Sequence, residues 1–148
     1  MSKGFVFRLQ KVLDIREEKE EESKRFFRES QKALNEAKIE LSNMESNANK
    51  YKGIKPNEDV VYQKIKRTYL KALELGIKDK KKEVIDKKEE VEYRRNDLLN
   101  KQIDRKTVEK LKEKEREAFF KEIDRVEQIN NDEFALYAYM RNLKGGEI

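Results

Sequence analysis

Apolar and small residues recur every three or four positions along most of this chain. The first stretch of this pattern, over about residues 5–51, contains no proline and no glycine. Steps of three and four place side chains on one face of an α-helix, so the stretch predicts a long helix with one narrow seam, as in a coiled coil. The seam positions are Phe5, Leu9, Val12, Ser23, Phe26, Ser30, Ala33, Ala37, Leu41, Met44, Ala48 and Tyr51, with Arg16 and Lys19 in the gap after Val12.

The same pattern resumes after a short break and predicts a second helix over about residues 58–143. Its seam positions begin Tyr62, Ile65, Tyr69, Leu73 and Ile77, and continue through Val84, Val91 and Leu98. In the break, Gly53 accepts a positive φ cheaply and Pro56 cannot continue a helix, so residues 52–57 are predicted to form a turn. Together these elements predict an all-α fold, a long antiparallel two-helix coiled coil with an extended C-terminal helix, as a single domain over residues 1–148.

The second predicted helix is much longer than the first. If the turn centres near Ile54, Phe5 lies opposite roughly residue 103, and about forty residues project beyond the paired region, on the order of 60 Å. Aromatic and aliphatic side chains are frequent in this overhang, so we expect a partner to cover them. The alternative is a bend at Gly76 that brings both termini together, since glycine weakens a helix interior.

The composition excludes most catalytic chemistry. Charged residues make up 45% of the 148 and apolar residues 36%, whereas an ordinary globular domain is about 25% charged and about 45–50% apolar. The chain has no cysteine and no histidine, which removes disulfides, cysteine nucleophiles, histidine bases and Cys/His zinc sites. No glycine-rich phosphate loop is present. We therefore expect a protein that is not an enzyme and binds no cofactor, metal or small-molecule ligand.

The charge and hydropathy of the chain limit the classes of partner that we expect. Lysine and arginine number 36 against 31 acidic residues, a net charge of +5. The net charge is +3 over residues 1–57 and +2 over residues 58–148. Basic and acidic residues alternate along both parts, which is typical of solvated helix faces. The longest apolar run, residues 134–140, is far shorter than the roughly 20 residues that span a bilayer. We expect a soluble cytoplasmic protein; a nucleic-acid-binding coiled coil and a homo-oligomeric scaffold remain as alternatives.

The opening Phe5-Val6-Phe7-Arg8-Leu9-Gln10 and the residues that follow it, to Glu17, resemble the start of the flagellar export stalk proteins, the FliJ family. Residues 109–114, with Glu127-Gln128 and Asp132-Glu133, are similar to a second recurrent region of that family. The resemblance covers nearly the whole chain and agrees with its length and its single early turn.

This resemblance implies a role in bacterial flagellar type III protein export. Proteins of this family are antiparallel coiled coils similar to the stalk of rotary ATPases. They associate with the hexameric export ATPase and with the cytoplasmic domain of the membrane export gate, help to couple the two, and have been linked to escorting export chaperones. The implied location is the cytoplasm, peripherally at the cytoplasmic face of the cell membrane at the flagellar base.

By the same resemblance, the surface that binds the export gate lies near the turn. The matching residues step by four, three and four on each helix, so each set occupies one helix face. They are Glu40, Met44, Asn47 and Tyr51 on the first helix and Tyr69, Leu73, Gly76 and Lys80 on the second. The alternative for Met44, Tyr51, Tyr69 and Leu73 is that they simply close the hairpin.

The two terminal segments are the candidates for binding the ATPase. Arginine and aromatic side chains are favoured at protein interfaces, and both segments supply them. The candidates are Phe5, Phe7, Arg8, Leu9 and Lys11, with Phe119, Phe120, Phe134, Tyr137 and Met140. The alternative is that Leu9, Val12, Phe119, Ile123 and Val126 belong to the coiled-coil core.

Overall fold

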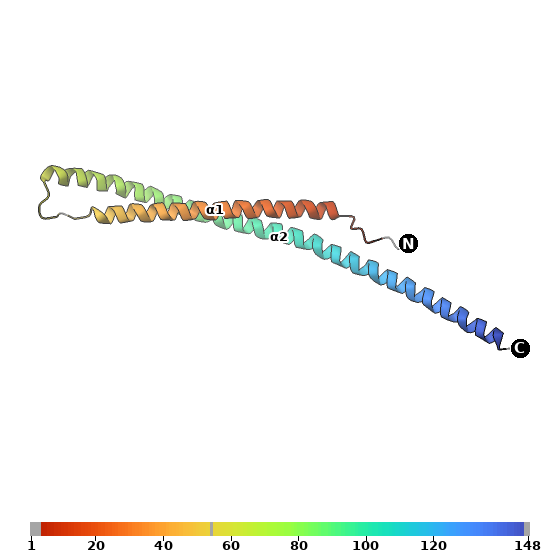
Figure 1. Ribbon diagram of the computed structural model, residues 1–148. Helices are drawn as coiled ribbons and strands as arrows, with labels where there is room; N and C mark the ends of the chain where they lie inside the picture. The colour runs from red at the N-terminus through yellow and green to blue at the C-terminus, as the bar shows by residue number, and fades with distance from the viewer. Residues whose placement is uncertain (1–3, 54, 147–148) are drawn as a thin grey trace. The chain divides into compact units, whose positions relative to one another are not determined.

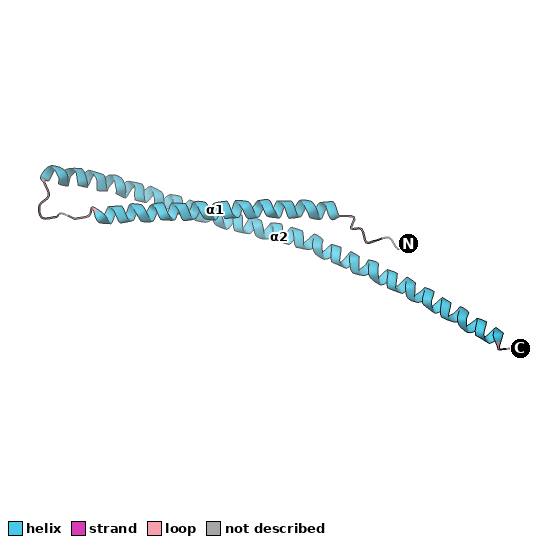
Figure 2. Ribbon diagram, viewed as in Figure 1, coloured by secondary structure: helices cyan, strands magenta, loops and turns pink. Residues whose placement is uncertain are grey.

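A computed structural model describes residues 4–53 and 55–146 of the chain. It contains two helices, α1 (Gln10–Lys50) and α2 (Val60–Gly145), which pack against each other, and these residues form no strand (Figures 1 and 2). The predicted all-α fold is therefore confirmed. Ile54, the predicted centre of the turn, lies outside the described residues.

The structure divides into two compact units, residues 18–102 and residues 1–17 with 103–148. In the first unit, α1 and the early part of α2 run antiparallel (Figure 1). The residues that meet across this hairpin lie symmetrically about position 60. The pairs are Ser23 with Asp97, Glu40 with Lys80, Met44 with Gly76 and Tyr51 with Tyr69.

The core of this unit is built from small side chains. The buried residues of its seam are Ser23, Ser30, Ala37 and Ala48 on α1, with Val84 and Val91 on α2. All six were predicted as seam positions, and their small size lets the two helices approach closely. By contrast, Tyr62 and Ile65 are exposed, so the prediction that the seam begins with them is wrong. The symmetric pairing explains this, since the pairing of the two arms begins only at Tyr69, whose partly exposed ring meets Tyr51 just after the end of α1.

Polar contacts also cross the seam of this unit. The Ser23 hydroxyl donates to Asp97 Oδ2 at 3.0 Å, so the buried hydroxyl has a partner. The Arg94 guanidinium lies 4.9 Å from the centre of the Phe26 ring, a cation–π contact between the two helices. These contacts hold the helices together where large aliphatic residues are missing.

In the second unit, the N-terminal segment is not helical. The predicted helix from residue 5 is wrong, because α1 begins only at Gln10. Phe7 is 6% exposed and packs with Leu13 and Val108, and Phe5 packs against this cluster. The backbone N–H of Gln10 donates to Phe7 O at 3.2 Å, which joins the extended segment to the helix.

The register of this unit also differs from the prediction. The Phe5 ring lies 5.7 Å from the Phe119 ring, so Phe5 pairs near residue 119 and not near residue 103. Part of the difference arises because the pairing is symmetric about residue 60 and not about residue 54. The hydrogen bond from the Arg16 guanidinium to the Asp104 carbonyl follows this symmetry. The rest arises because an extended segment advances about 3.3 Å per residue and a helix only about 1.5 Å.

The end of α2 has no intramolecular partner among the described residues. Every residue from 124 to 146 is exposed. This tail is shorter than the predicted overhang, at 23 residues or about 35 Å of helix. Because α2 continues as one helix through Gly76, the alternative in which the chain folds back there is wrong.

Candidate functional site

The residues predicted to bind the export gate lie opposite one another across the hairpin. They form four positions symmetric about residue 60: Glu40 with Lys80, Met44 with Gly76, Asn47 with Leu73, and Tyr51 with Tyr69. Three of these pairs are in contact. The fold therefore collects both sequence sets into one strip, which we call the hairpin strip.

Lys80 is held within this strip. Its ammonium group forms ion pairs with Glu40 across the hairpin and with Glu83 at 3.0 Å on its own helix. The hydrogen bond to Glu40, followed by that to Glu83, raises the pKa of Lys80 above its ordinary value. The Lys80 side chain is only 16% exposed. The Lys80 charge is thus neutralised by ion pairs within the hairpin. Lys80 is therefore less accessible to a partner than the sequence prediction assumed.

The remaining members of the hairpin strip combine packing with exposure. A Cβ on Gly76 would lie 2.8 Å from Met44 Cε, so glycine admits the methionine. The Tyr51 and Tyr69 rings meet edge to face at 5.4 Å. Tyr69 and Asn47 are nevertheless exposed, which leaves a partner both an aromatic and an amide group to contact.

The predicted ATPase-binding residues fall into two groups. Phe5, Phe7 and Phe119 pack within their unit, so they are largely occupied by intramolecular contacts. The other members are exposed on the surface: Arg8, Leu9, Lys11, Phe120, Phe134, Tyr137 and Met140. Leu9 and Val12 are exposed while Leu13 is buried, so the alternative that placed Leu9 and Val12 in the core is wrong.

The exposed tail carries an apolar stripe. Val126, Phe134 and Tyr137 follow Phe119 and the half-buried Ile123 at helical spacing, interrupted by Asn130. The face that packs against the N-terminal segment through Phe119 therefore continues into the tail, where nothing within the described chain covers it.

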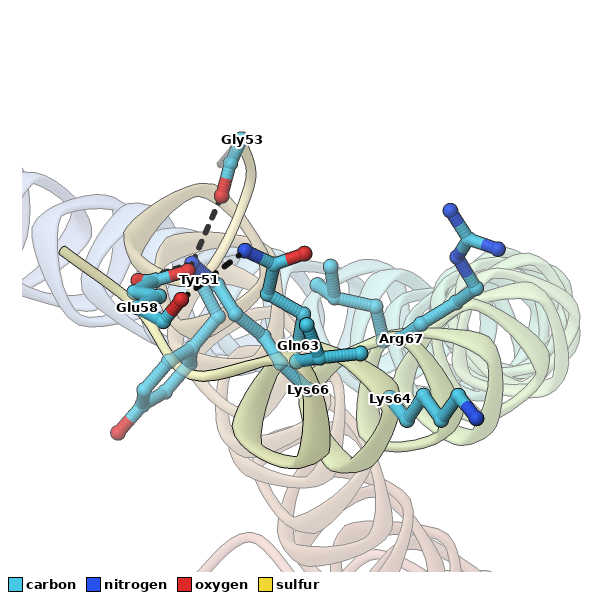
Figure 3. Close-up of a pocket in the computed structure, with 9 residues that line it drawn as sticks. Tyr51, Gly53, Glu58, Gln63, Lys64, Lys66 and Arg67 are labelled. Carbon is cyan, nitrogen blue, oxygen red and sulfur yellow. Dashed lines mark hydrogen bonds and ion pairs between the residues drawn. The ribbon is translucent and has the colours of Figure 1, made fainter. Parts of the chain in front are cut away.

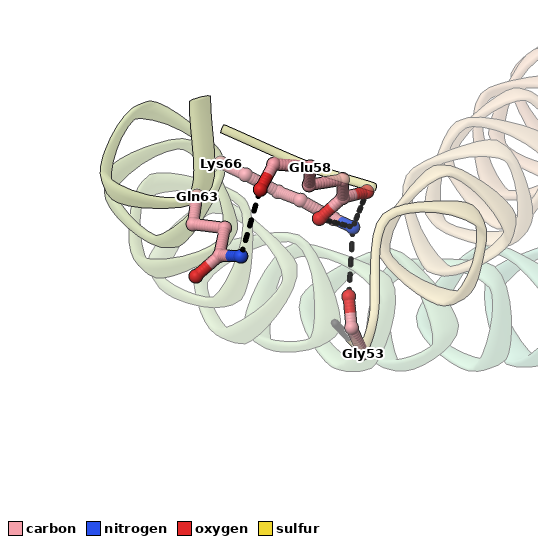
Figure 4. A network of polar contacts seen from close by, with 4 residues as sticks. All are labelled: Gly53, Glu58, Gln63 and Lys66. Carbon is pink, nitrogen blue, oxygen red and sulfur yellow. Dashed lines mark hydrogen bonds and ion pairs between the residues drawn. The ribbon is translucent and has the colours of Figure 1, made fainter. Parts of the chain in front are cut away.

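The turn end of the hairpin is held by a buried lysine that sequence reasoning missed. Lys66 is 8% exposed. Its Nζ lies 2.7 Å from Gly53 O and 3.1 Å from Glu58 Oε1, and Gln63 Nε2 donates to the Glu58 carbonyl at 3.3 Å (Figure 4). In a chain this rich in lysine, no local signal distinguishes Lys66, because its partners come from the loop that folds back beside it.

Beside this network lies a pocket of about 350 Å³, which we call the turn pocket (Figure 3). Its lining includes Tyr51 from the end of α1, Gly53 and Glu58 from the loop, and Lys64 and Arg67 from α2. Gly53 has a φ of 89°, the left-handed conformation for which glycine was predicted here. Asn57 also has a positive φ, 138°.

Over the parts of the chain that the structure describes, no group of three or more acidic side chains could hold a metal ion. No helix within these same residues is long and apolar enough to cross a membrane.

The hairpin, its exposed helical tail and its charged surface define a helical scaffold or stalk class of protein. A comparison with family models finds a match to the one described as "Flagellar FliJ protein" over residues 5–144. The chain therefore belongs to the FliJ family, a non-catalytic component of the flagellar export apparatus. Comparisons with curated proteins and with solved structures find no match.

Proposed function

We propose that this protein is the stalk that links the export ATPase to the export gate. Its tail would contact the ATPase hexamer, its hairpin strip would contact the cytoplasmic domain of the gate protein, and the two contacts would together promote export of flagellar proteins. The observation that carries this proposal is the exposed apolar stripe of the tail, which a monomer in water leaves uncovered.

Family membership and the exposed surfaces support these partners. Phe134, Tyr137 and Met140 are 71%, 63% and 52% exposed, and anchors of this type supply much of the binding energy at protein interfaces. A stalk with these partners acts in the cytoplasm at the membrane face of the flagellar base. Export chaperones are a further class of partner under this proposal.

Deletion of residues 130–148 tests the ATPase contact. The described part of this segment has no buried side chain, so the hairpin should keep its helicity and its unfolding temperature. Stimulation of ATP hydrolysis by the purified export ATPase should be lost. Replacement of Phe134, Tyr137 and Met140 by alanine should have the same effect, while alanine at exposed Asp132 and Asn142 serves as the control. Full stimulation by the triple variant would contradict the proposal.

Sedimentation separates this proposal from the homo-oligomeric scaffold. At micromolar concentration the chain alone should sediment as a monomer and should enter a larger complex only when the ATPase is present. A stable dimer that the same triple substitution dissociates would favour the scaffold instead.

Asn47→Glu tests the gate contact. Asn47 is exposed and makes no side-chain hydrogen bond among the described residues, so the substitution should leave circular dichroism unchanged. It should weaken binding to the purified cytoplasmic domain of the gate protein. Unchanged affinity would count against the hairpin strip as the contact surface.

A further inference from the structure

The turn end of the hairpin carries the whole excess of positive charge in this chain. Residues 50–71 contain seven basic and two acidic side chains, whereas the rest of the chain has equal numbers of each. When the charges are counted on either side of residue 57, this cluster is split between the two halves and does not show. The prediction that basic and acidic residues alternate along the chain is therefore wrong for residues 50–71. The fold reunites its two parts, because the Lys66 ammonium binds the Gly53 carbonyl across the turn.

The cations of this cluster differ in their surroundings. Lys66 is buried and its charge is matched by Glu58 at 3.1 Å. Lys64 and Arg67 are exposed, line the turn pocket and form no ion pair within residues 4–53 and 55–146. Figure 3 shows both side chains extending away from the Lys66–Glu58 contact. These two charges are therefore free to meet a charge on another molecule.

The turn pocket also has an apolar side, formed by Tyr51, Val60 and Leu70. It exists because of the register of the hairpin. Tyr51, just after the end of α1, already meets Tyr69, so the first turns of α2 have no helix opposite them. The loop covers the side of α2 that bears Lys66, and the side that bears Arg67 stays open.

We infer that the turn pocket receives an acidic side chain, with an apolar neighbour, from the gate protein that binds the hairpin strip. This inference rests on the proposed gate binding. Tyr51 belongs to both surfaces, so one partner segment would contact them without a gap. The carboxylate lies between Lys64 and Arg67, and the apolar neighbour packs on Val60 and Leu70.

The shape of the site favours a protein side chain over a polyanion. Nucleic acid and anionic lipid surfaces engage rows of cations spread over many phosphates. Here the two unpaired cations flank one hollow of about 350 Å³, near the lower end of the range of about 300–1,000 Å³ in which proteins bind small groups.

The test is a charge reversal of the pocket. Lys64→Glu/Arg67→Glu is compared with Lys82→Glu/Lys88→Glu, an equal change of charge at exposed positions of α2 outside the pocket. Binding of each full-length variant to the purified cytoplasmic domain of the gate protein is measured at low and at physiological salt, with circular dichroism as the check on folding. The pocket variant should bind about tenfold more weakly and lose most of its salt dependence, because the charges that steer the partner are reversed. The control should bind within about twofold of the unaltered chain.

The remaining outcomes each overturn the inference. Equal weakening in both variants would mean that only net charge matters. If the unaltered chain does not bind the gate domain, gate binding itself fails; if it binds and the pocket variant matches it, only the pocket assignment fails. Tight binding of duplex DNA, of anionic vesicles or of a second copy that the pocket variant alone abolishes would assign the pocket to that occupant instead.

Discussion

Gly76 of α2 lies directly against Met44 of α1, and a Cβ added to the glycine would come within 2.8 Å of Met44 Cε. The clash is with the end of a flexible side chain, which can move. Since alanine is favoured over glycine in a helix by about 1 kcal/mol, Gly76→Ala should change stability little, because moving the methionine offsets the gain. In a Met44→Ala background the same substitution should stabilise by about 1 kcal/mol. Thermal unfolding of the four proteins measures the difference, and equal effects in both backgrounds would contradict the contact.

Phe7 ties the N-terminal segment to α2. Because its buried ring packs with Leu13 and Val108, Phe7→Ala should cost about 3 kcal/mol of local stability. The segment before Gln10 should then exchange its amide hydrogens faster and be cleaved sooner by protease. Val6→Ala, at a residue 81% exposed, is the matched control and should change neither measurement.

Lys66 and Glu58 should be coupled. Lys66→Met removes the partner of the Gly53 carbonyl and of a largely buried carboxylate, and should destabilise by about 2 kcal/mol. Adding Glu58→Leu should recover part of this loss, because an apolar pair replaces a buried ion pair at little cost. Chemical unfolding of both single variants and of the double variant gives the coupling free energy between Lys66 and Glu58. If the changes in unfolding free energy simply add, the ion pair does not hold the loop.

The ion pairs of Lys80 predict a loss of stability at alkaline pH. Glu40 and then Glu83 raise the pKa of this lysine above its ordinary value of 10.5 in the folded chain. Its contribution to stability is therefore complete below that value, including at neutral pH, and disappears as the pH rises through the raised pKa. The free energy of unfolding should fall less between pH 9 and pH 11 for Lys80→Met than for the unaltered chain. An equal fall in both proteins would mean that these ion pairs contribute nothing to stability.

Much of the fold was predictable from local patterns. Ser23, Ser30 and Ala37 follow one another at seven-residue steps, and this spacing alone predicted their burial. Gly53 also signalled the turn, since few other residues adopt its positive φ.

The register was not predictable, because it depends on contacts between distant residues. The loop folds back on Lys66, and this sets which residue of α2 meets the end of α1. One missed signal was local: Phe5 and Phe7 are two positions apart, a spacing that shares a face in an extended chain but not in a helix.

The residues of the hairpin strip were predicted as one face on each helix near the turn, and the structure pairs them across the hairpin. The turn pocket was not predicted, because Tyr51 and Arg67 meet there only through the fold. The burial of Phe7 was not predicted, since its spacing from Phe5 was interpreted as part of a helix and an aromatic residue near a terminus is equally compatible with a free surface.

The mirror-like pairing about residue 60 has a consequence for engineering the chain. A single residue inserted near Lys82 displaces every later contact of the hairpin by one position. Lengthening the hairpin without losing its seam thus requires whole seven-residue blocks, added in both arms at matching distances from the centre.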